Sequence, residues 1–323
     1  MDAAETIETS LAPERASVAL PARSRADART RDSISRAREH LLSLQDADGW
    51  WKAELQTNVT MDAEDLLLRE FLGIRDAALT GRTARWIRSQ QRPDGSWGKF
   101  YGADGDLSIT AEAYVALRLA GDEPDAAHMR SAAAFVRESG GLQKARVFTH
   151  IWLAMFGAWS WDQVPTLPVE LILLPHWVPL NVYDFACWAR QTVVAMSVVM
   201  AYRPQRRLHF TLDELYGDQP WRPPAGSSAV GRILGALDNV LRLYQRRPLR
   251  RLREYALALA ERWIVDRQEA DGSWGGIQPP WVYSLIGLTL RGYPLDHPVI
   301  KLGLAGLDSF AIDDGQTRRL EAC

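Results

Sequence analysis

The amino-acid sequence predicts an all-α protein folded as an α/α barrel, a toroid in which helix pairs form an inner and an outer ring. Helical periodicity dominates the chain, and alternating strand patterns are scarce. The phrase Q-x-x-x-G-x-W occurs three times. Its first two copies begin at Gln45 and Gln91, and this period of 46 residues is typical of stacked helix pairs.

Eleven segments carry the helical period, with apolar residues recurring every three or four positions. In chain order they are 32–45, 60–73, 81–91, 108–120, 126–139, 148–157, 186–202, 228–246, 252–268, 280–291 and 297–307. Two proline-broken segments, 162–184 and 203–226, are expected to form irregular connections between them.

The repeated phrase predicts how a helix ends. Its copies are Gln45, Gly49 and Trp51; Gln91, Gly95 and Trp97; and Gln268, Gly272 and Trp274. An Asp-Gly pair after a helical pattern is a stop signal, because glycine adopts the left-handed conformation that terminates a helix. The tryptophan can then fold back over the glutamine amide, with its indole N–H on a carbonyl. We therefore expect each repeat to be joined to the end of its own helix.

Composition narrows the class of protein. The 323 residues are 47% hydrophobic and 24% charged, a balance typical of a soluble globular protein with a large core. A net charge of −2 gives no basic field for nucleic acid. Two cysteines make neither a disulfide framework nor a zinc site and suit the cytoplasm, and the six histidines lack metal-ligand spacing. The sequence predicts no metal, and no uncharged stretch long enough to span a bilayer.

Five further stretches carry a family resemblance beyond the repeat. They are Asn58-Val59-Thr60-Met61, Glu112-Ala113-Tyr114-Val115-Ala116-Leu117, Arg146-Val147-Phe148-Thr149, Pro179-Leu180-Asn181-Val182-Tyr183 and Trp274-Gly275-Gly276-Ile277-Gln278-Pro279-Pro280-Trp281. From about residue 32 to the end, the chain resembles the squalene-hopene cyclases of bacterial type, which are triterpene cyclases. The match is specific because several unrelated stretches occur in the right order.

The resemblance implies proton-initiated polycyclisation of squalene to hopene or hopanol, without a cofactor, by a peripheral (monotopic) enzyme at the inner face of the cell membrane. Family members are about twice as long and carry their proton donor in an Asp-x-Asp-Asp motif of the second half, which this chain lacks. The N-terminus has no apolar run and is rich in Ala, Arg and Ser, which predicts a disordered tail (1–31). The resemblance implies a barrel domain (32–296) and the start of the return to a missing C-terminal catalytic half (297–323). Alone, such a chain is expected to be inactive.

Site residues carry over from the same resemblance. The pocket that holds the quenching water would contain Thr60, Glu64, Glu112, Arg146, Trp152, Gln278, Pro279 and Tyr283. The substrate cavity and channel would contain Leu55, Phe148, Phe185, Trp188, Val193 and Ile277. The residues themselves add that acids on apolar helices, as at Glu64 and Glu112, need a partner, and Arg146 is the natural one. A structural ion pair and ordinary core packing are the alternative interpretations.

Three hypotheses about function follow. In the first, the chain is the N-terminal domain of a squalene-hopene cyclase that acts on squalene at the membrane surface. In the second, it is a subunit of a split cyclase or an inactive scaffold, completed by a second polypeptide. In the third, the barrel cleaves carbohydrate with Glu64 and Glu112 as acid and base. The expected lining of Trp, Phe, Ile and Leu suits a hydrocarbon better, so the first hypothesis is preferred.

Overall fold

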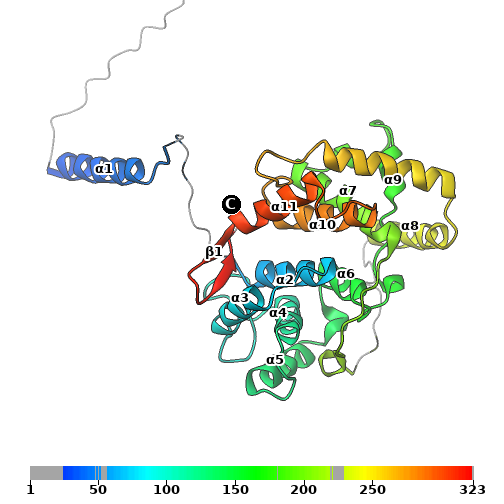
Figure 1. The fold of residues 1–323 in the computed structure, drawn as a ribbon, viewed down its shortest axis with the longest axis horizontal. Helices are drawn as coiled ribbons and strands as arrows, with labels where there is room; N and C mark the ends of the chain where they lie inside the picture. Colours follow the sequence, from blue (N-terminus) through cyan, green and yellow to red (C-terminus); the bar gives the residue numbers. More distant parts are fainter. Residues whose placement is uncertain are drawn as a thin grey trace, which may run out of the picture. The chain divides into compact units, whose positions relative to one another are not determined.

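The computed structural model describes residues 25–47, 49, 51, 57–179, 181–218, 220 and 229–321. Over these residues the regular secondary structure is almost entirely helical, as the sequence predicts (Figure 1). The α-helices are α1 (Arg25–Ser43), α2 (Thr60–Leu72), α3 (Ala77–Ser89), α4 (Leu107–Leu119), α5 (Ala127–Glu138), α6 (Val147–Met155), α7 (Cys187–Tyr202), α8 (Ala229–Arg246), α9 (Arg250–Val265), α10 (Gln278–Leu290) and α11 (Pro298–Ser309). Short 3₁₀ helices are η1 (Leu142–Lys144), η2 (Trp161–Gln163), η3 (Val169–Leu173), η4 (Val182–Asp184) and η5 (Asp213–Leu215).

The chain divides into two compact units, Met1–Ala53 and Glu54–Cys323. The first contains α1 and the first copy of the repeat, in which the Trp51 indole donates to the Leu41 carbonyl at 2.6 Å. Most of the expected tail, 1–31, lies outside the described residues, but its last part from Arg25 onward is helical. The expected start of this helix at residue 32 is therefore too late. The second unit is the α/α barrel.

Two kinds of helix make the barrel. The inner helices α2, α4, α7 and α10 bury half or more of their residues. Helices α4, α7 and α10 are largely apolar, whereas α2 buries the charged side chains Asp62, Glu64, Asp65 and Arg69 beside its leucines. The outer helices α3, α5, α9 and α11 are amphipathic and bury one face. Segments far apart in sequence meet in the inner ring, where α10 packs against both α7 and α2, and α2 packs against α4 (Figure 1).

The second copy of the repeat joins two outer helices. The Trp97 indole donates to the Ile87 carbonyl at 2.7 Å, which ties the loop to the last turn of α3. The Gln91 amide donates to the Gly95 carbonyl at 2.9 Å and also to the His128 carbonyl, at 2.9 Å, in the first turn of α5. The phrase therefore closes its own turn and fixes the helix that follows in the outer ring.

The third copy repeats this geometry. The Trp274 indole donates to the Ile264 carbonyl of α9 at 2.8 Å. The Gln268 amide donates to the Gly272 carbonyl at 3.2 Å and to the Val299 carbonyl of α11 at 2.8 Å. The same local sequence therefore gives the same connection between outer helices, because each glutamine has two N–H donors for two carbonyls.

A short hairpin follows α11, although no pattern of the sequence predicts it. Strands β1 (Ala311–Asp313) and β2 (Arg318–Leu320) pair antiparallel, with Ala311 opposite Leu320. The hairpin packs against α2 and α3, the first two helices of the second unit. It lies within the range 297–323 that the sequence assigns to the return towards a second half, and this assignment stays a prediction.

Candidate functional site

A cavity of about 380 Å³ opens in the second unit between the starts of α2, α6 and α10 and the hairpin. Its lining residues are Thr57, Asn58, Thr60, Met61, Glu64, Arg146, Phe148, Gly276, Ile277, Gln278, Pro279, Trp281, Tyr283, Leu307, Phe310, Leu320 and Glu321. The wall combines apolar side chains with a small number of charged and polar ones, which is typical of a small-molecule site.

Arg146 of this lining forms an ion pair with Glu112, which lies behind it. Glu112 is 2% exposed on α4, and its Oε2 accepts a hydrogen bond from Arg146 Nη2 at 2.7 Å. The Thr149 hydroxyl, one turn along α6, donates to the other carboxylate oxygen. Arg146 Nη2 also reaches the Thr60 hydroxyl at 3.4 Å. The buried charge is therefore partnered on both oxygens, as a buried carboxylate requires.

Glu64 lies on the cavity wall close to this pair. It is 5% exposed on α2. Burial raises the pKa of Glu64, and the neighbouring Glu112 carboxylate raises it further, while Arg146 lowers it. Burial also raises the pKa of Glu112, against the lowering effect of Arg146. Two buried acids with one arginine between them favour a state in which a carboxyl keeps its proton at neutral pH.

Aromatic rings cover one side of the acids. Tyr283 of α10 is 1% exposed and stacks on Trp152 of α6, with 6.0 Å between ring centroids. Phe148 lies 6.4 Å from the Tyr283 ring. The Tyr283 hydroxyl has no hydrogen-bond partner among the described residues. Burial and the two nearby carboxylates raise the pKa of Tyr283 well above its usual value, so the hydroxyl keeps its proton and remains a donor.

The start of α10 supplies the remaining polar group. Gln278 is the first residue of the helix, and Pro279 and Pro280 follow in its first turn, where a missing N–H costs nothing. The Gln278 amide donates to the Met61 carbonyl at 2.9 Å, which fastens α10 to α2 across the cavity. Ile277 comes immediately before the helix and lines the same wall.

The structure thus gathers most of the positions named from the sequence. Of the eight pocket residues, six line the cavity: Thr60, Glu64, Arg146, Gln278, Pro279 and Tyr283. Glu112 and Trp152 are not on the lining but contact Arg146 and Tyr283. Of the channel residues, Phe148 and Ile277 line the cavity.

Three of the expected channel residues lie away from this cavity, and one cannot be placed. Trp188, which the family resemblance implies is a cavity aromatic, is 60% exposed at the start of α7. Phe185 and Val193 are half-buried and are not among the lining residues. Leu55 lies outside the described residues. A helical period identifies the apolar face of α7, but it does not say which neighbour covers each position.

Sequence reasoning missed several residues of the wall. Phe310, Leu320 and Glu321 reach the cavity from the hairpin region, and no sequence signal links them to α2. Thr149, by contrast, could have been found: it lies three residues after Arg146, so the two face the same side of the helix start.

Two negative findings concern the described part of the chain. It contains no cluster of three or more His, Cys, Asp or Glu side chains that could hold a metal ion. None of its helices combines the length and the apolar character needed to cross a membrane.

Comparisons with known proteins identify the family of the chain. Residues 34–316 match the family described as the squalene-hopene cyclase N-terminal domain. The chain is 41% identical to the squalene-hopene cyclase of Alicyclobacillus acidocaldarius, over 87% of this chain and 45% of that relative. It is 35% identical to the squalene-hopene cyclase of Zymomonas mobilis, over 87% and 44%.

A plant relative has a different name. The dammaradiene synthase of Dryopteris crassirhizoma is 33% identical, over 87% of this chain and 42% of its own length. The chain therefore spans less than half the length of these relatives. By its matched residues and its helical barrel, the chain belongs to the squalene-hopene cyclase N-terminal domain family.

Proposed function

We propose that this chain forms the water-binding end of the substrate cavity of a squalene-hopene cyclase. The observation that carries the proposal is the position of the Glu64, Glu112 and Arg146 cluster beside a cavity whose other walls are largely apolar. A hydrocarbon cation needs apolar and aromatic walls along its length and a polar group only where the reaction ends. The second half of the enzyme, supplied in the same chain or by a partner, would bring the acid that starts the cascade.

The cluster suits the last step of such a cascade. A water held by Thr60, Gln278 or Tyr283 would add its oxygen to the final carbocation, and the C–O bond would form as its proton passes to a carboxylate. Loss of a proton from the neighbouring carbon to the same water would instead give the alkene. Arg146 would keep one carboxylate ionised and ready to accept the proton, since it lowers the pKa of both acids.

The same contacts argue against carbohydrate cleavage. A glycosidase needs two carboxyl groups that reach the substrate from either side of the scissile bond. Glu112 is 2% exposed, and its two oxygens are occupied by Arg146 and Thr149. Only Glu64 of the two acids lies on the cavity lining.

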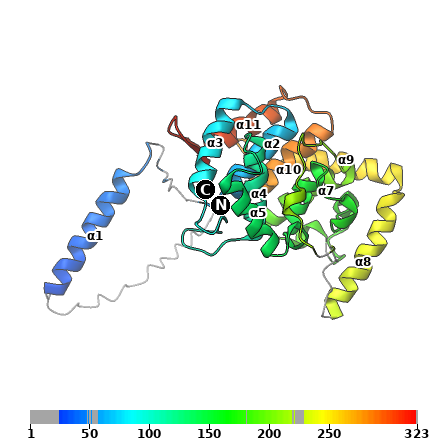
Figure 2. The ribbon, with the colours of Figure 1, turned by 90° about the horizontal axis from the view of Figure 1, so that it is seen from below.

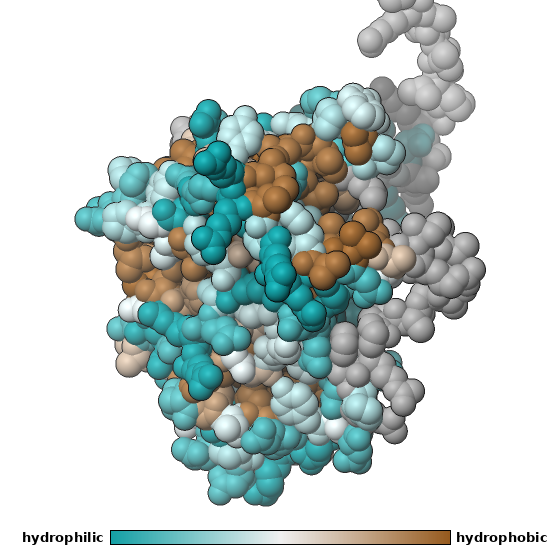
Figure 3. All heavy atoms as spheres, turned by 90° about the vertical axis from the view of Figure 1, so that its right-hand side faces the viewer, coloured by the Kyte–Doolittle hydropathy of each residue, from teal (hydrophilic) through white to brown (hydrophobic). Residues whose placement is uncertain are grey.

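Helix α8 supports attachment to a membrane surface. Two of its polar side chains contact the body of the unit: Asp238 accepts a hydrogen bond from the Thr166 N–H at 2.7 Å, and Gln245 donates to the Met200 carbonyl at 3.1 Å. Two of its apolar side chains point outward, with Val240 64% and Leu243 70% exposed. Figure 2 shows α8 at the edge of this unit, and Figure 3 shows apolar patches on the surface. An amphipathic helix with its apolar face outward is suited to lie in a lipid interface, so we propose a peripheral position at the membrane from which squalene is taken.

The test uses the chain joined to the second half of the Alicyclobacillus relative. Gln278→Ala removes the donor to Met61 and a polar group of the wall. It should change the ratio of hydroxylated to alkene product several-fold, because one hydrogen bond contributes about 1 kcal/mol. The rate of squalene consumption should change less. Gas chromatography of the products measures both quantities.

Gln90→Ala is the matched control, because Gln90 ends α3 and is not on the cavity lining. An unchanged product ratio in Gln278→Ala would remove this residue from the proposed site. The proposal also expects no metal dependence. Loss of activity on adding a chelator, with recovery on adding a divalent ion, would contradict it.

A further inference from the structure

Glu321 brings a second carboxylate to the cavity lining, beside Glu64, from the other end of the barrel sequence. It follows β2 directly, and its side chain is only 5% exposed. It lies on the same lining as Glu64 and Arg146. No motif of the sequence pointed to it, because it is separated from α2 by more than 240 residues.

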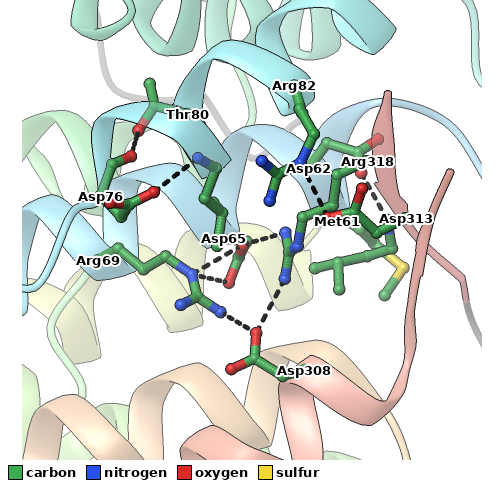
Figure 4. A network of polar contacts seen from close by, with 12 residues as sticks. Met61, Asp62, Asp65, Arg69, Asp76, Thr80, Arg82, Asp308, Asp313 and Arg318 are labelled. Atoms are coloured by element: carbon green, nitrogen blue, oxygen red, sulfur yellow. Dashed lines mark hydrogen bonds and ion pairs between the residues drawn. The ribbon is translucent and has the colours of Figure 1, made fainter. Parts of the chain in front are cut away.

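A set of buried contacts fixes Glu321 in this place. The Glu321 N–H donates to the Phe310 carbonyl at 3.0 Å. The preceding residue, Leu320, donates its N–H to Asp62 Oδ1 at 2.7 Å. Arg318 forms a buried ion pair with Asp65, at 2.8 Å, so the strand is fastened to α2 at two points (Figure 4). These tertiary contacts therefore fix the position of the Glu321 backbone at the cavity.

The two oxygens of Glu321 differ in their contacts. Oε1 accepts a hydrogen bond from Arg319 Nε at 3.2 Å. Oε2 is buried and has no hydrogen-bond partner among the described residues. A buried carboxylate oxygen without a donor is costly, and native structures almost always satisfy such a group with protein, water or ligand.

A second buried polar atom on the same cavity also has no partner. The Tyr283 hydroxyl is a donor at neutral pH, and nothing in the described residues accepts its proton. The cavity thus presents one unused acceptor, on Glu321, and one unused donor, on Tyr283. A hydroxyl group can donate to the first or accept from the second, whereas a pure hydrocarbon can do neither.

We propose that Glu321 is a ligand-binding residue of this cavity and that its free oxygen accepts a hydrogen bond from an O–H group. The O–H belongs either to an aliphatic alcohol lodged between the apolar walls or to a bound water. The binding of an alcohol is independent of the proposed cyclase function. The water version rests on that function, because it adds Glu321 to the groups that hold the quenching water.

The first experiment measures binding to the full chain by calorimetry. The probes are octan-1-ol and 1-fluorooctane, which have similar shapes but differ in the hydroxyl donor. The wild type should bind the alcohol about tenfold more tightly, the equivalent of one hydrogen bond to a charged acceptor. Glu321→Leu should abolish this preference. Glu321→Gln keeps an accepting oxygen without the charge and should retain about a threefold preference.

Two controls belong to this experiment. Glu138→Leu changes an exposed glutamate at the end of α5, away from the cavity, and should leave the preference intact. Thermal unfolding checks that each variant is folded. If Glu321→Leu does not fold, the comparison of wild type with the isosteric Glu321→Gln still decides. An alcohol preference of equal size in the wild type and both variants would overturn the alcohol version.

The second experiment separates water from alcohol. In the joined cyclase, Glu321→Gln is compared with Glu112→Gln by the ratio of hydroxylated to alkene product. A shift in both variants, without an alcohol preference in the first experiment, identifies the ligand as water. A shift in Glu112→Gln alone, again without alcohol preference, overturns the inference and leaves the proposed function standing. If neither variant shifts the product ratio and the first experiment shows no alcohol preference, both the inference and the proposed function are overturned.

Discussion

Replacing Asp62 by asparagine should remove a pH dependence from the stability of the barrel. Asp62 is 1% exposed on α2. Burial raises the pKa of its carboxyl group from 3.8 to about 8, although the hydrogen bond from the Leu320 N–H lowers it in part. Asparagine has nearly the same shape and keeps an accepting oxygen for Leu320, but it has no proton to lose.

The sign and size of the effect follow from this pKa. The folded protein keeps a proton on Asp62 over a range in which the unfolded chain has lost it. The contribution to stability is therefore complete below pH 3.8 and is lost as the pH rises towards 8. Each pH unit in this range lowers the free energy of unfolding by about 1.4 kcal/mol. From pH 5 to pH 7, the wild type should lose about 3 kcal/mol relative to Asp62→Asn.

Urea unfolding, followed by tryptophan fluorescence at pH 5, 6 and 7, measures this difference. Asp106→Asn is the control. Burial raises the pKa of Asp106, but the N–H groups of Ile109 and Ser108 and the Lys99 ammonium outweigh burial and lower it overall. The difference in free energy of unfolding between Asp106→Asn and the wild type should therefore stay constant from pH 5 to pH 7. Parallel stability curves for the wild type and Asp62→Asn would refute the reasoning.

Two further predictions concern the hairpin and the surface. Arg318→Met removes an arginine that pairs with Asp65, which is 0% exposed, and should lower the free energy of unfolding by about 3 kcal/mol or more. The control Arg203→Met, at an exposed ion pair, should lower it by less than about 1 kcal/mol. Equal losses for the two variants in urea unfolding would contradict the assignment. Leu243→Glu should weaken binding to phosphatidylcholine–phosphatidylglycerol vesicles about tenfold in a flotation assay, because a leucine contributes about 1.5 kcal/mol or more on burial. Leu295→Glu is the control. Equal binding of the wild type and both variants would show that α8 does not contact the lipid.

Helix α2 contacts the hairpin with one face and lines the cavity with another. On one, Asp62 and Asp65 hold Leu320 and Arg318 (Figure 4). On the other, Thr60 and Glu64 line the cavity. The contacts that fasten the hairpin therefore also set the position of the proposed water-binding groups, so a structural substitution at Asp65 can change the site without touching it.

Much of the fold could be predicted from the sequence because its signals are local. The expected helices agree with the observed ones to within about four residues for every helix of the barrel. The Asp-Gly stops are equally local. Gly95 has φ of 84°, and a Cβ there would lie 2.6 Å from Ser131, so only glycine suits both the turn and the packing. The sequence also predicted that Arg146 pairs with a glutamate of an apolar helix, because a buried acid requires a partner.

The features that only the tertiary structure decided are those that depend on contacts between segments far apart in the sequence. Nothing near Glu321 in sequence indicates that it shares a cavity with Glu64, because their meeting depends on the hairpin that docks on α2. Trp188 is a second example: the family resemblance implies a cavity aromatic, a role that stays a prediction, whereas in the described structure the side chain is 60% exposed. Sequence periodicity determines which face of a helix is apolar, whereas the packing of the whole chain determines what that face meets.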